Sequence, residues 1–268
     1  MRILVAIDEL DPTAAHHLEV GSELARAFGV GLVAFHTCAA PDVEAATRDL
    51  TALAGGMEVQ VAPYDPRGRA AAIVAAADRH RCELVVIGTQ GLDPFVGRFL
   101  DSPAHKLLEA GRCPILVIHP ERGLRRRERG VVMIAMADPV FSLRVLQHGL
   151  ELARALGAAA KIVHVGSREE DPVATLLGRS GAHPSQVMLA EAVAEFNRSG
   201  VEAEGQVIPN YGGIAEELAH AADRLDADAI VIGSSGKLDL GEWLLGSIAE
   251  AVLHRSQRPV LVVPSLTL

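Results

Sequence analysis

The sequence predicts two tandem α/β domains, each built on a doubly wound parallel sheet of about five strands. The chain repeats itself, since VVIGTQG at 85–91 returns as IVIGSSG at 230–236, at a constant offset of 145 residues. Its apolar runs are short and continuous, as in strands that are covered on both faces. Helical patterns separate these runs, and alternating strands and helices form parallel sheets with right-handed crossovers.

The repeat covers nearly the whole chain. ELARAFG at 23–29 matches ELARALG at 151–157, at an offset of 128 residues. Because the offset later becomes 145, the second copy carries 17 additional residues. They lie within 167–200, where the first copy has only the shorter segment 41–56. The sequence is therefore a duplication with one insertion.

The elements follow from the apolar pattern. The expected strands are the continuous apolar runs at 3–7, 84–88, 115–118, 230–233 and 260–263, with two further strands ending at 34–36 and 162–164. The expected helices are the amphipathic segments at 16–28, 43–53, 69–80, 102–110, 143–156, 185–197, 214–225 and 247–256. In the helix at 43–53, one face gathers Val43, Ala46, Leu50 and Leu53.

A charged segment separates the two copies. Apolar periodicity stops in ERGLRRRERG at 121–130, which is typical of a solvated linker. We therefore expect domains at 1–120 and 131–268. A length of 268 residues suits two domains, and a hydrophobic content of 49% is enough for two cores.

Composition excludes several classes of protein. A formal net charge of −9 argues against nucleic acid or an anionic membrane as the main partner, because both require a basic surface. The three cysteines form no CxxC pair, so neither a disulfide framework nor a zinc site is expected. A reducing cytoplasm fits best. Met1 leads directly into the first strand, and no apolar run is long enough to span a membrane, so we expect a soluble cytoplasmic protein.

A glycine-rich pattern follows the fourth strand of the second copy. Gly233 and Gly236 come first, nine residues intervene, and Gly246 and Ser247 open a helix. Glycines let backbone N–H groups approach an anion, and the start of a helix adds unpaired donors and about half a positive charge. Ligands of open parallel sheets bind beyond the carboxyl ends of the strands. The pattern therefore predicts a phosphate site, although it is neither a Walker A motif nor a dinucleotide fingerprint.

Several residues that could bind a ligand or take part in catalysis are expected to have structural roles. Ser247 is expected to cap its helix, with Glu250 completing an S-x-x-E capping box, and this role does not exclude a ligand. His36 and His164 occupy equivalent ends of the second strand. Neither has a neighbouring Ser, Cys or carboxylate at triad spacing, so we expect hydrogen-bonded packing residues. The remaining histidines show no metal-binding spacing, and we find no catalytic constellation.

The first strand ILVAID, the glycine loop ending in Gly-Ser, and the closing strands CPILVI and RPVLVV resemble the universal stress protein family in its tandem form. The resemblance covers nearly the whole chain and implies an adenine nucleotide alpha hydrolase-like, or flavodoxin-like, sandwich. It also implies ATP, with Mg²⁺ as a candidate companion, across the carboxyl ends of strands one, two and four. It assigns the phosphates to Gly233, Ser234, Ser235, Gly236, Gly246 and Ser247, and the adenine to backbone atoms between Val163 and Val165.

The first copy departs from the family's pattern in its loop. It keeps the acidic residue at the end of strand one, and by resemblance its site comprises Asp8, Gly88, Gly91 and Ser102. However, Asp101 stands where a glycine is expected. A carboxylate facing phosphates costs on the order of 1 to 4 kcal/mol at effective dielectric constants of 80 to 20, so this site is expected to be the weaker one.

The second copy departs in the opposite way. It keeps every glycine, but Ala137 or Met136 aligns with the acidic residue of strand one. Asp138 takes that role if the loop is one residue shorter, and both alignments remain open. We expect the second domain to be the better nucleotide site.

The leading hypothesis is a cytoplasmic stress-response or regulatory protein that binds ATP, mainly in the second domain. Hydrolysis is expected to be slow or absent, because no residue is placed as a general base or arginine finger. The alternative is a nucleotide-independent interaction scaffold with degenerate sites. A third class, an enzyme acting on a nucleotidyl substrate, lacks paired acid and base residues.

The closing strands predict how the copies associate. In single-domain members of the resembled family the last strand commonly mediates dimerisation. We therefore expect Ile115 to Ile118 and Val260 to Val263 to form a pseudo-twofold pair within the chain, which would remove two exposed sheet edges. A homodimer is a further expectation.

Overall fold

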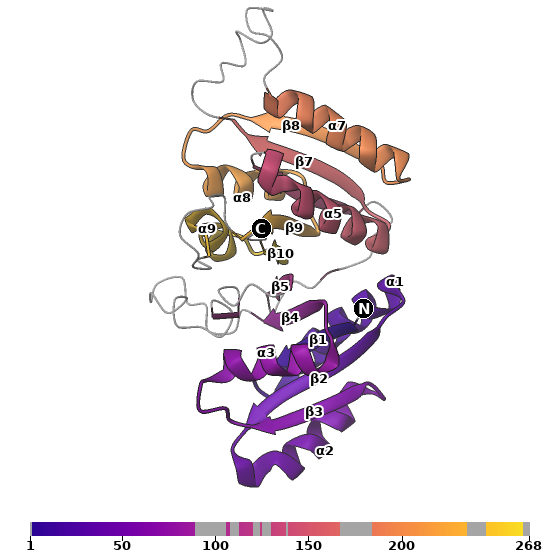
Figure 1. Ribbon diagram of the computed structural model, residues 1–268, viewed down its shortest axis with the longest axis vertical. Coiled ribbons are helices and arrows are strands. Elements are labelled where there is room, and N and C mark those ends of the chain that lie inside the picture. Colours follow the sequence, from indigo (N-terminus) through magenta and orange to yellow (C-terminus); the bar gives the residue numbers. More distant parts are fainter. Residues whose placement is uncertain are drawn as a thin grey trace, which may run out of the picture. The chain divides into compact units, whose positions relative to one another are not determined.

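The computed structural model describes residues 2–88, 106–107, 113–119, 124, 130–137, 139–166, 184–234 and 245–264. The chain splits into two compact units, and the main division follows Leu124. This point falls inside the segment 121–130 that the sequence marks as a linker, while the bounds of the domains themselves stay a prediction. Each unit is an α/β sandwich and is described by itself (Figure 1).

The first unit is a parallel sheet with helices on both faces. It contains, in order, β1 (Arg2–Ile7), α1 (Pro12–Phe28), β2 (Gly31–Cys38), η1 (Ala40–Asp42), α2 (Val43–Ala54), β3 (Glu58–Pro63), α3 (Arg69–His80), β4 (Leu84–Gly88) and β5 (Ile115–Ile118). The strand order is β3-β2-β1-β4-β5, and each neighbouring pair is parallel. The chain moves outward from β1 to β3 and then returns to β4. The switch point, where ligands of such sheets bind, therefore lies between β1 and β4.

The second unit repeats this plan. It contains β6 (Val131–Met136), α5 (Pro139–Leu156), β7 (Ala159–Val165), α7 (Pro184–Arg198), β8 (Ala203–Ile208), α8 (Ile214–Arg224), β9 (Ala229–Gly233), α9 (Ser247–Arg255) and β10 (Val260–Val263). Its strand order is β8-β7-β6-β9-β10, again with parallel neighbours. The switch point lies between β6 and β9.

The core of each unit is its sheet. The central strands are almost completely buried, as their continuous apolar sequences predict. The predicted runs at 84–88, 115–118 and 260–263 match the strands residue for residue. The helix predicted at 69–80 is likewise confirmed, whereas the one at 102–110 lies largely outside the described residues.

Local signals set the ends of α1. It begins four residues before the predicted start, because the Asp11 carboxylate accepts hydrogen bonds from the backbone N–H groups of Thr13 (2.9 Å) and Ala14 (3.3 Å). Pro12 suits the first helical position. The helix ends at Gly29, whose φ of 67° is a left-handed conformation that glycine adopts without strain.

One predicted helix face needs correction. In α2 the buried side chains are Ala46, Leu50 and Ala54, whereas Leu53 is 41% exposed. The helix extends one residue beyond the predicted segment, so Ala54 rather than Leu53 completes the inward stripe at a spacing of four residues.

Candidate functional site

The two switch points can be compared residue by residue. In the first unit Ile7 pairs with His36, and in the second Met136 pairs with His164, at the carboxyl ends of the strands. Each histidine donates through Nδ1 to the carbonyl oxygen of its strand partner, at 3.0 Å in both units. The predicted packing role of these histidines is therefore confirmed. The pairing also places Ala137, directly after Met136, at the position of Asp8.

The helices give the rest of the correspondence. A Cβ added to Gly21 of α1 would collide with Val5, and one added to Gly149 of α5 would collide with Ile134. These matching contacts place α1 and α5 in the same register, 128 residues apart. Likewise, α3 and α8 both start after a glycine with positive φ, at 99° and 124°. His17 therefore corresponds to Val145, and Arg69 to Ile214.

In the first unit, Arg69 closes the switch point from the side of α3. Its guanidinium donates to the backbone carbonyls of Ile7 (2.9 Å) and Asp8 (2.6 Å) and forms an ion pair with the Asp8 carboxylate. Burial lowers the pKa of this guanidinium. Asp8, the acidic residue that the sequence assigned to a ligand, is therefore engaged by the protein's own side chain.

His17 fills the other side of the same switch point. Its side chain belongs to α1, is 2% exposed, and lies against Gly88 at the end of β4. A Cβ on Gly88 would come within 2.2 Å of the imidazole Cε1. Neither ring nitrogen has a hydrogen-bond partner among the residues that the structure describes. Burial, helped by the charge of His16, lowers the pKa of His17 to about 4, so the ring is neutral at physiological pH.

The second unit has replaced all three of these side chains. Ala137, Ile214 and Val145 stand where the first unit has Asp8, Arg69 and His17. Val145 is buried, whereas Ala137 and Ile214 are exposed at the carboxyl edge of the sheet. The switch point of the second unit is therefore lined by smaller or apolar groups, with neither an ion pair nor an imidazole among these three positions.

The two ends of the glycine pattern meet in the second unit. Gly233 ends β9, and the N–H of Ser234 donates to the carbonyl of Val263 at 2.8 Å. The N–H of Gly246 then donates to the carbonyl of Ser234 at 2.6 Å. This bond brings the start of α9 against the end of β9, as a phosphate-binding loop between them requires.

The start of α9 corrects one prediction. Gly246, not Ser247, is the N-cap residue, and as a glycine it has no side chain to cap the helix. Ser247 is the first helical residue and is exposed, so the predicted capping box does not form. The Glu250 backbone N–H instead donates to the Gly246 carbonyl at 3.0 Å, as in a regular first turn. The N-cap residue itself therefore offers no side chain that would compete with an anion at this helix end.

The remaining predicted residues divide into two groups. Val163 and Val165 lie at the end of β7, where Val165 pairs with Ile208 of β8. Outside the described residues lie Gly91, Asp101, Ser102, Asp138, Ser235 and Gly236.

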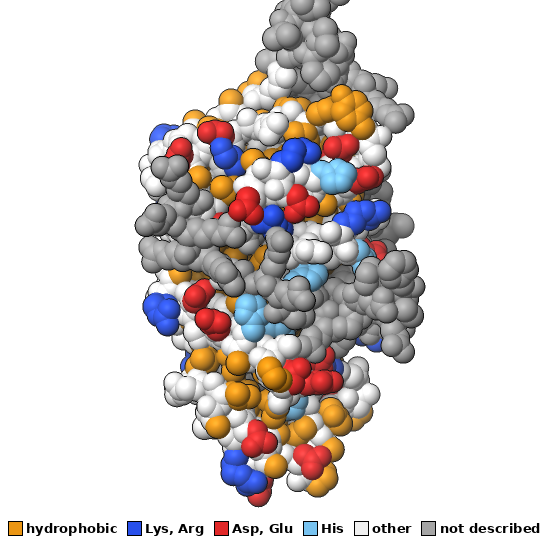
Figure 2. Space-filling view, turned by 180° about the vertical axis from the view of Figure 1, so that it is seen from behind, with side chains coloured by type: hydrophobic (Ala, Val, Ile, Leu, Met, Phe, Trp, Pro, Cys, Tyr) orange, Lys and Arg blue, Asp and Glu red, His pale blue; other side chains and the backbone are white. Residues whose placement is uncertain are grey.

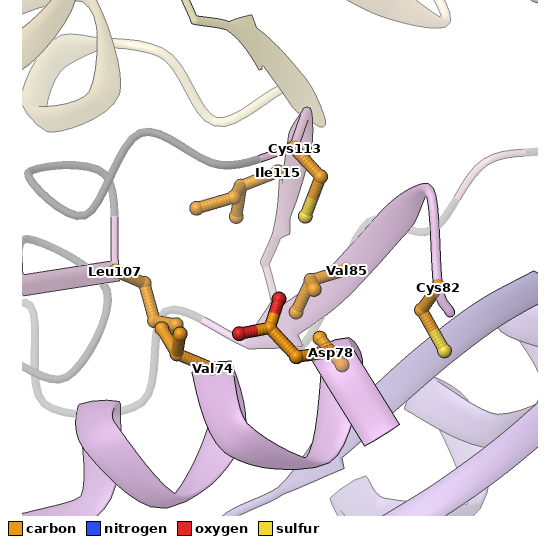
Figure 3. Close-up of a pocket in the computed structure, with 8 residues that line it drawn as sticks. Val74, Asp78, Cys82, Val85, Leu107, Cys113 and Ile115 are labelled. Carbon is orange, nitrogen blue, oxygen red and sulfur yellow. The ribbon is translucent and has the colours of Figure 1, made fainter. Parts of the chain in front are cut away.

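A cavity of about 60 Å³ lies elsewhere in the first unit (Figure 3). It is lined by Val74, Ala77, Asp78, Cys82, Val85, Leu107, Cys113 and Ile115. Except for Leu107, these residues come from the second half of α3 and from the segments at the start of β4 and β5, at the edge opposite to the predicted ligand edge. Burial raises the pKa of Cys82 to about 11 and that of Cys113 to about 12, so both thiols are protonated and weakly nucleophilic.

The second unit shows why this cavity exists. Arg258, at the position of Cys113, is buried and donates to the Ala227 carbonyl (2.7 Å) and the Asp226 carboxylate (2.9 Å). Its guanidinium also approaches Asp223, the counterpart of Asp78. The cavity marks the space that a longer side chain occupies in the other copy. Sequence reasoning missed Arg258, although its alignment with Cys113 was visible.

Three further observations concern chemistry and surface. Among the described residues, no group of three or more His, Cys, Asp or Glu side chains is arranged to hold a metal ion. Within the same part of the chain, no helix is long and apolar enough to cross a membrane. On the face shown in Figure 2, acidic and basic side chains are interspersed, as is typical of a solvated surface.

The comparison with protein families decides the affiliation. The family model described as the Universal stress protein family matches residues 66–119 and 129–264, one segment in each unit. The chain belongs to the universal stress protein family. The resemblance drawn from the strand and glycine motifs is thereby confirmed.

Relatives of this universal stress protein match along most of its length. Universal stress protein Rv2624c of Mycobacterium tuberculosis is 24% identical over 210 residues, which are 78% of this chain and 72% of the relative. A universal stress protein of Archaeoglobus fulgidus superposes with a TM-score of 0.69 at 16% identity and covers 98% of this chain and 96% of its own. A functionally unknown protein of Pseudomonas aeruginosa PAO1 superposes with a TM-score of 0.70 at 21% identity, covering 98% and 92%. The predicted α/β fold class is confirmed.

Proposed function

We propose that this universal stress protein binds an adenine nucleotide, ATP, at the switch point of its second unit. The main support for the proposal is that the two units differ in the side chains at three equivalent positions of the switch point. The first unit fills its switch point with Arg69, Asp8 and His17, whereas the second presents Ile214, Ala137 and Val145. A site for a heterocyclic ligand is mostly apolar, with a few well-placed polar groups, and the second unit fits that description.

The polar groups of the proposed site are backbone donors. The N-cap residue of α9 is a glycine, so it has neither a capping side chain nor a Cβ that would hold a phosphate away from the N–H groups. The hydroxyl group of Ser247 is exposed at the same place and adds a donor. We assign the phosphates to this helix start and to Gly233, Ser234, Ser235 and Gly236, with Mg²⁺ as their counter-ion.

Electrostatics favour the second unit for the same reason. In the first unit the Asp8 carboxylate is already paired with Arg69, and Asp101 stands in place of a glycine in the phosphate loop. Like charges a few ångströms apart cost on the order of 1 to 4 kcal/mol. At the position of Asp101 the second unit has Gly246, so the repulsion between a carboxylate and the phosphates does not arise there.

The proposed role is binding with slow or no turnover. Val145, Ile214 and Ala137, which stand at the positions of His17, Arg69 and Asp8, cannot transfer protons. His164 has no Ser, Cys or carboxylate at triad spacing in the sequence, and its Nδ1 donates to the Met136 carbonyl, so we assign it a packing role. Nucleotide binding would then act through conformation or partner choice. A cytoplasmic location and pairing of the two closing strands within the chain belong to the same proposal.

The closed switch point of the first unit favours a second role for that unit, as a scaffold without nucleotide. One experiment separates the two roles. Freshly purified protein is denatured, the released nucleotide is identified by mass spectrometry, and the emptied protein is titrated with ATP by calorimetry. We expect one ATP per chain. Two per chain would contradict the closed first unit, and no heat at millimolar ATP would leave only the scaffold role.

Gly246→Asp is the matching variant, because it copies Asp101 of the first unit into the second. Asp is a preferred N-cap residue, so the change should leave the helix and the circular dichroism spectrum intact. We expect it to abolish ATP binding, since a carboxylate would occupy the anion position. A Gly246→Ser variant, which adds a Cβ and a capping side chain but no charge, serves as the control. It should lose less affinity than Gly246→Asp, and equal losses would show that the size of the side chain, not its charge, excludes the phosphates.

A further inference from the structure

An exposed aromatic side chain lies beside the proposed nucleotide site. Tyr211 is 77% exposed and belongs to the loop 209–213, which joins β8 to α8. The loop starts at Ile208, which pairs with Val165 and accepts a hydrogen bond from the Gly166 N–H at 2.9 Å. It ends at α8, which packs on β7. The loop therefore lies at the carboxyl edge of β7 and β8, next to the strand end assigned to adenine.

The loop that carries Tyr211 is held at three backbone positions. The N–H groups of Tyr211 and Gly212 both donate to Oε1 of Glu217, each at 3.2 Å. The N–H of Gly213 donates to Oδ1 of Asn210 at 3.0 Å. Because these bonds fix the backbone, ordering the loop costs little when a ligand binds. The ring is presented to solvent from a structured position rather than from a free chain end.

The first unit offers a counterpart. The chain contains two tyrosines, and the other, Tyr64, is 67% exposed in the corresponding loop 64–68 between β3 and α3. Tyr64 lies two positions earlier in its loop than Tyr211 does, and the switch point beside it is the one closed by Arg69 and His17. Tyr64 therefore provides an internal control for an exposed tyrosine that is not beside an open site.

We propose that Tyr211 stacks on the base of the bound nucleotide and makes the site select for a purine rather than for a phosphate chain alone. This inference rests on the proposed function. The base would lie between the Tyr211 ring and the backbone at Val163 to Val165, which the sheet holds rigid. Stacking of a base on an aromatic side chain changes affinity by roughly 10-fold or more in other proteins, because both faces leave water together.

The test compares three variants against two ligands. Tyr211→Ala, Tyr211→Phe and Tyr64→Ala are titrated by calorimetry with MgATP and with inorganic tripolyphosphate, which has the charge but no base. We expect Tyr211→Ala to raise the Kd for ATP about 10-fold and to leave the Kd for tripolyphosphate unchanged. Tyr211→Phe keeps the ring, so it should bind ATP as the unchanged protein does. Tyr64→Ala should bind both ligands normally.

The outcomes separate the two proposals. If the unchanged protein binds neither ligand, the proposed function fails and the stacking role fails with it. If the protein binds ATP and Tyr211→Ala binds ATP equally well, the nucleotide site stands and the stacking role is overturned. A parallel loss of ATP and tripolyphosphate affinity in Tyr211→Ala would also overturn it, since that result would indicate a structural role for the loop.

Discussion

Acid should weaken the first unit through His17. The imidazole is buried against Gly88, and neither nitrogen has a partner among the described residues, so a proton placed on it would put a charge in a buried position. The charge of Asp11 opposes this effect, but its attraction is smaller than the cost of burial. The perturbation we propose is a fall in pH from 7 to 4, compared between the unchanged protein and His17→Val.

The sign and size follow from the two pKa values of His17. The pKa is 6.5 in the unfolded chain and about 4 in the folded unit. Because the unfolded chain binds the proton more tightly, the free energy of unfolding falls as the pH drops through the interval between the two values. One pKa unit corresponds to about 1.4 kcal/mol. His17 should therefore lower the free energy of unfolding by about 2 kcal/mol between pH 7 and pH 5, and by about 3 kcal/mol by pH 4.

The assay is urea unfolding at a series of pH values, followed by circular dichroism. His17→Val introduces the residue that the second unit carries at this position, Val145, and removes the titrating group. Between pH 7 and pH 5, the free energy of unfolding should fall by about 2 kcal/mol less in the variant than in the unchanged protein. His220→Val, at an exposed histidine, controls for the loss of a histidine as such. Parallel pH profiles for the unchanged protein and His17→Val would show that the His17 imidazole is not buried in its neutral form.

Two further predictions test the packing differences between the units. Gly88→Ala should lower the free energy of unfolding by about 1 to 3 kcal/mol, since its Cβ would meet the His17 ring at 2.2 Å. In a double-mutant cycle measured by urea unfolding, His17→Val should recover most of that loss. Additive losses of the two variants would contradict the contact between His17 and Gly88. Cys113→Arg combined with Arg81→Asp rebuilds the set formed by Arg258 and Asp226 and fills the cavity of about 60 Å³. The free energy of unfolding of this double variant should rise by about 1 kcal/mol, which calorimetry would detect as a higher Tm. A lower Tm would show that the two units pack differently at this position.

Much of the fold could be predicted because the strands are buried on both faces. A continuous apolar run such as ILVI at 115–118 has one favourable place in an α/β sandwich, and the structure puts it there. Helix ends were less predictable, since they depend on single side chains. The Asp11 cap and Pro12 move the start of α1 forward by four residues, a signal present in the sequence but outweighed by apolar spacing.

The candidate site was predictable in outline but not in its contacts. Gly246 could be assigned to a helix start from spacing alone, whereas Ser247 had the composition of a cap and does not act as one. The ion pair between Arg69 and Asp8 joins residues 61 positions apart, and nothing local in the sequence indicates it. The same holds for the contact of His17 with Gly88. Such pairs become visible only when the switch point brings β1, α1, α3 and β4 together.

The differences between the two switch points are best understood as coordinated changes at contacting positions. Arg69 without Asp8 would leave a half-buried guanidinium without its carboxylate, and Asp8 without Arg69 would lose the partner that holds it at the strand end. Replacing only one of the two is therefore costly, whereas Ile214 and Ala137 remove both charges together. His17 fits only against a residue without a Cβ, and the second unit has Gly233 at the position of Gly88 but Val145 at the position of His17. The imidazole that excludes a Cβ at position 88 is thus replaced by a valine in the second unit, and we propose that the phosphates require Gly233 instead.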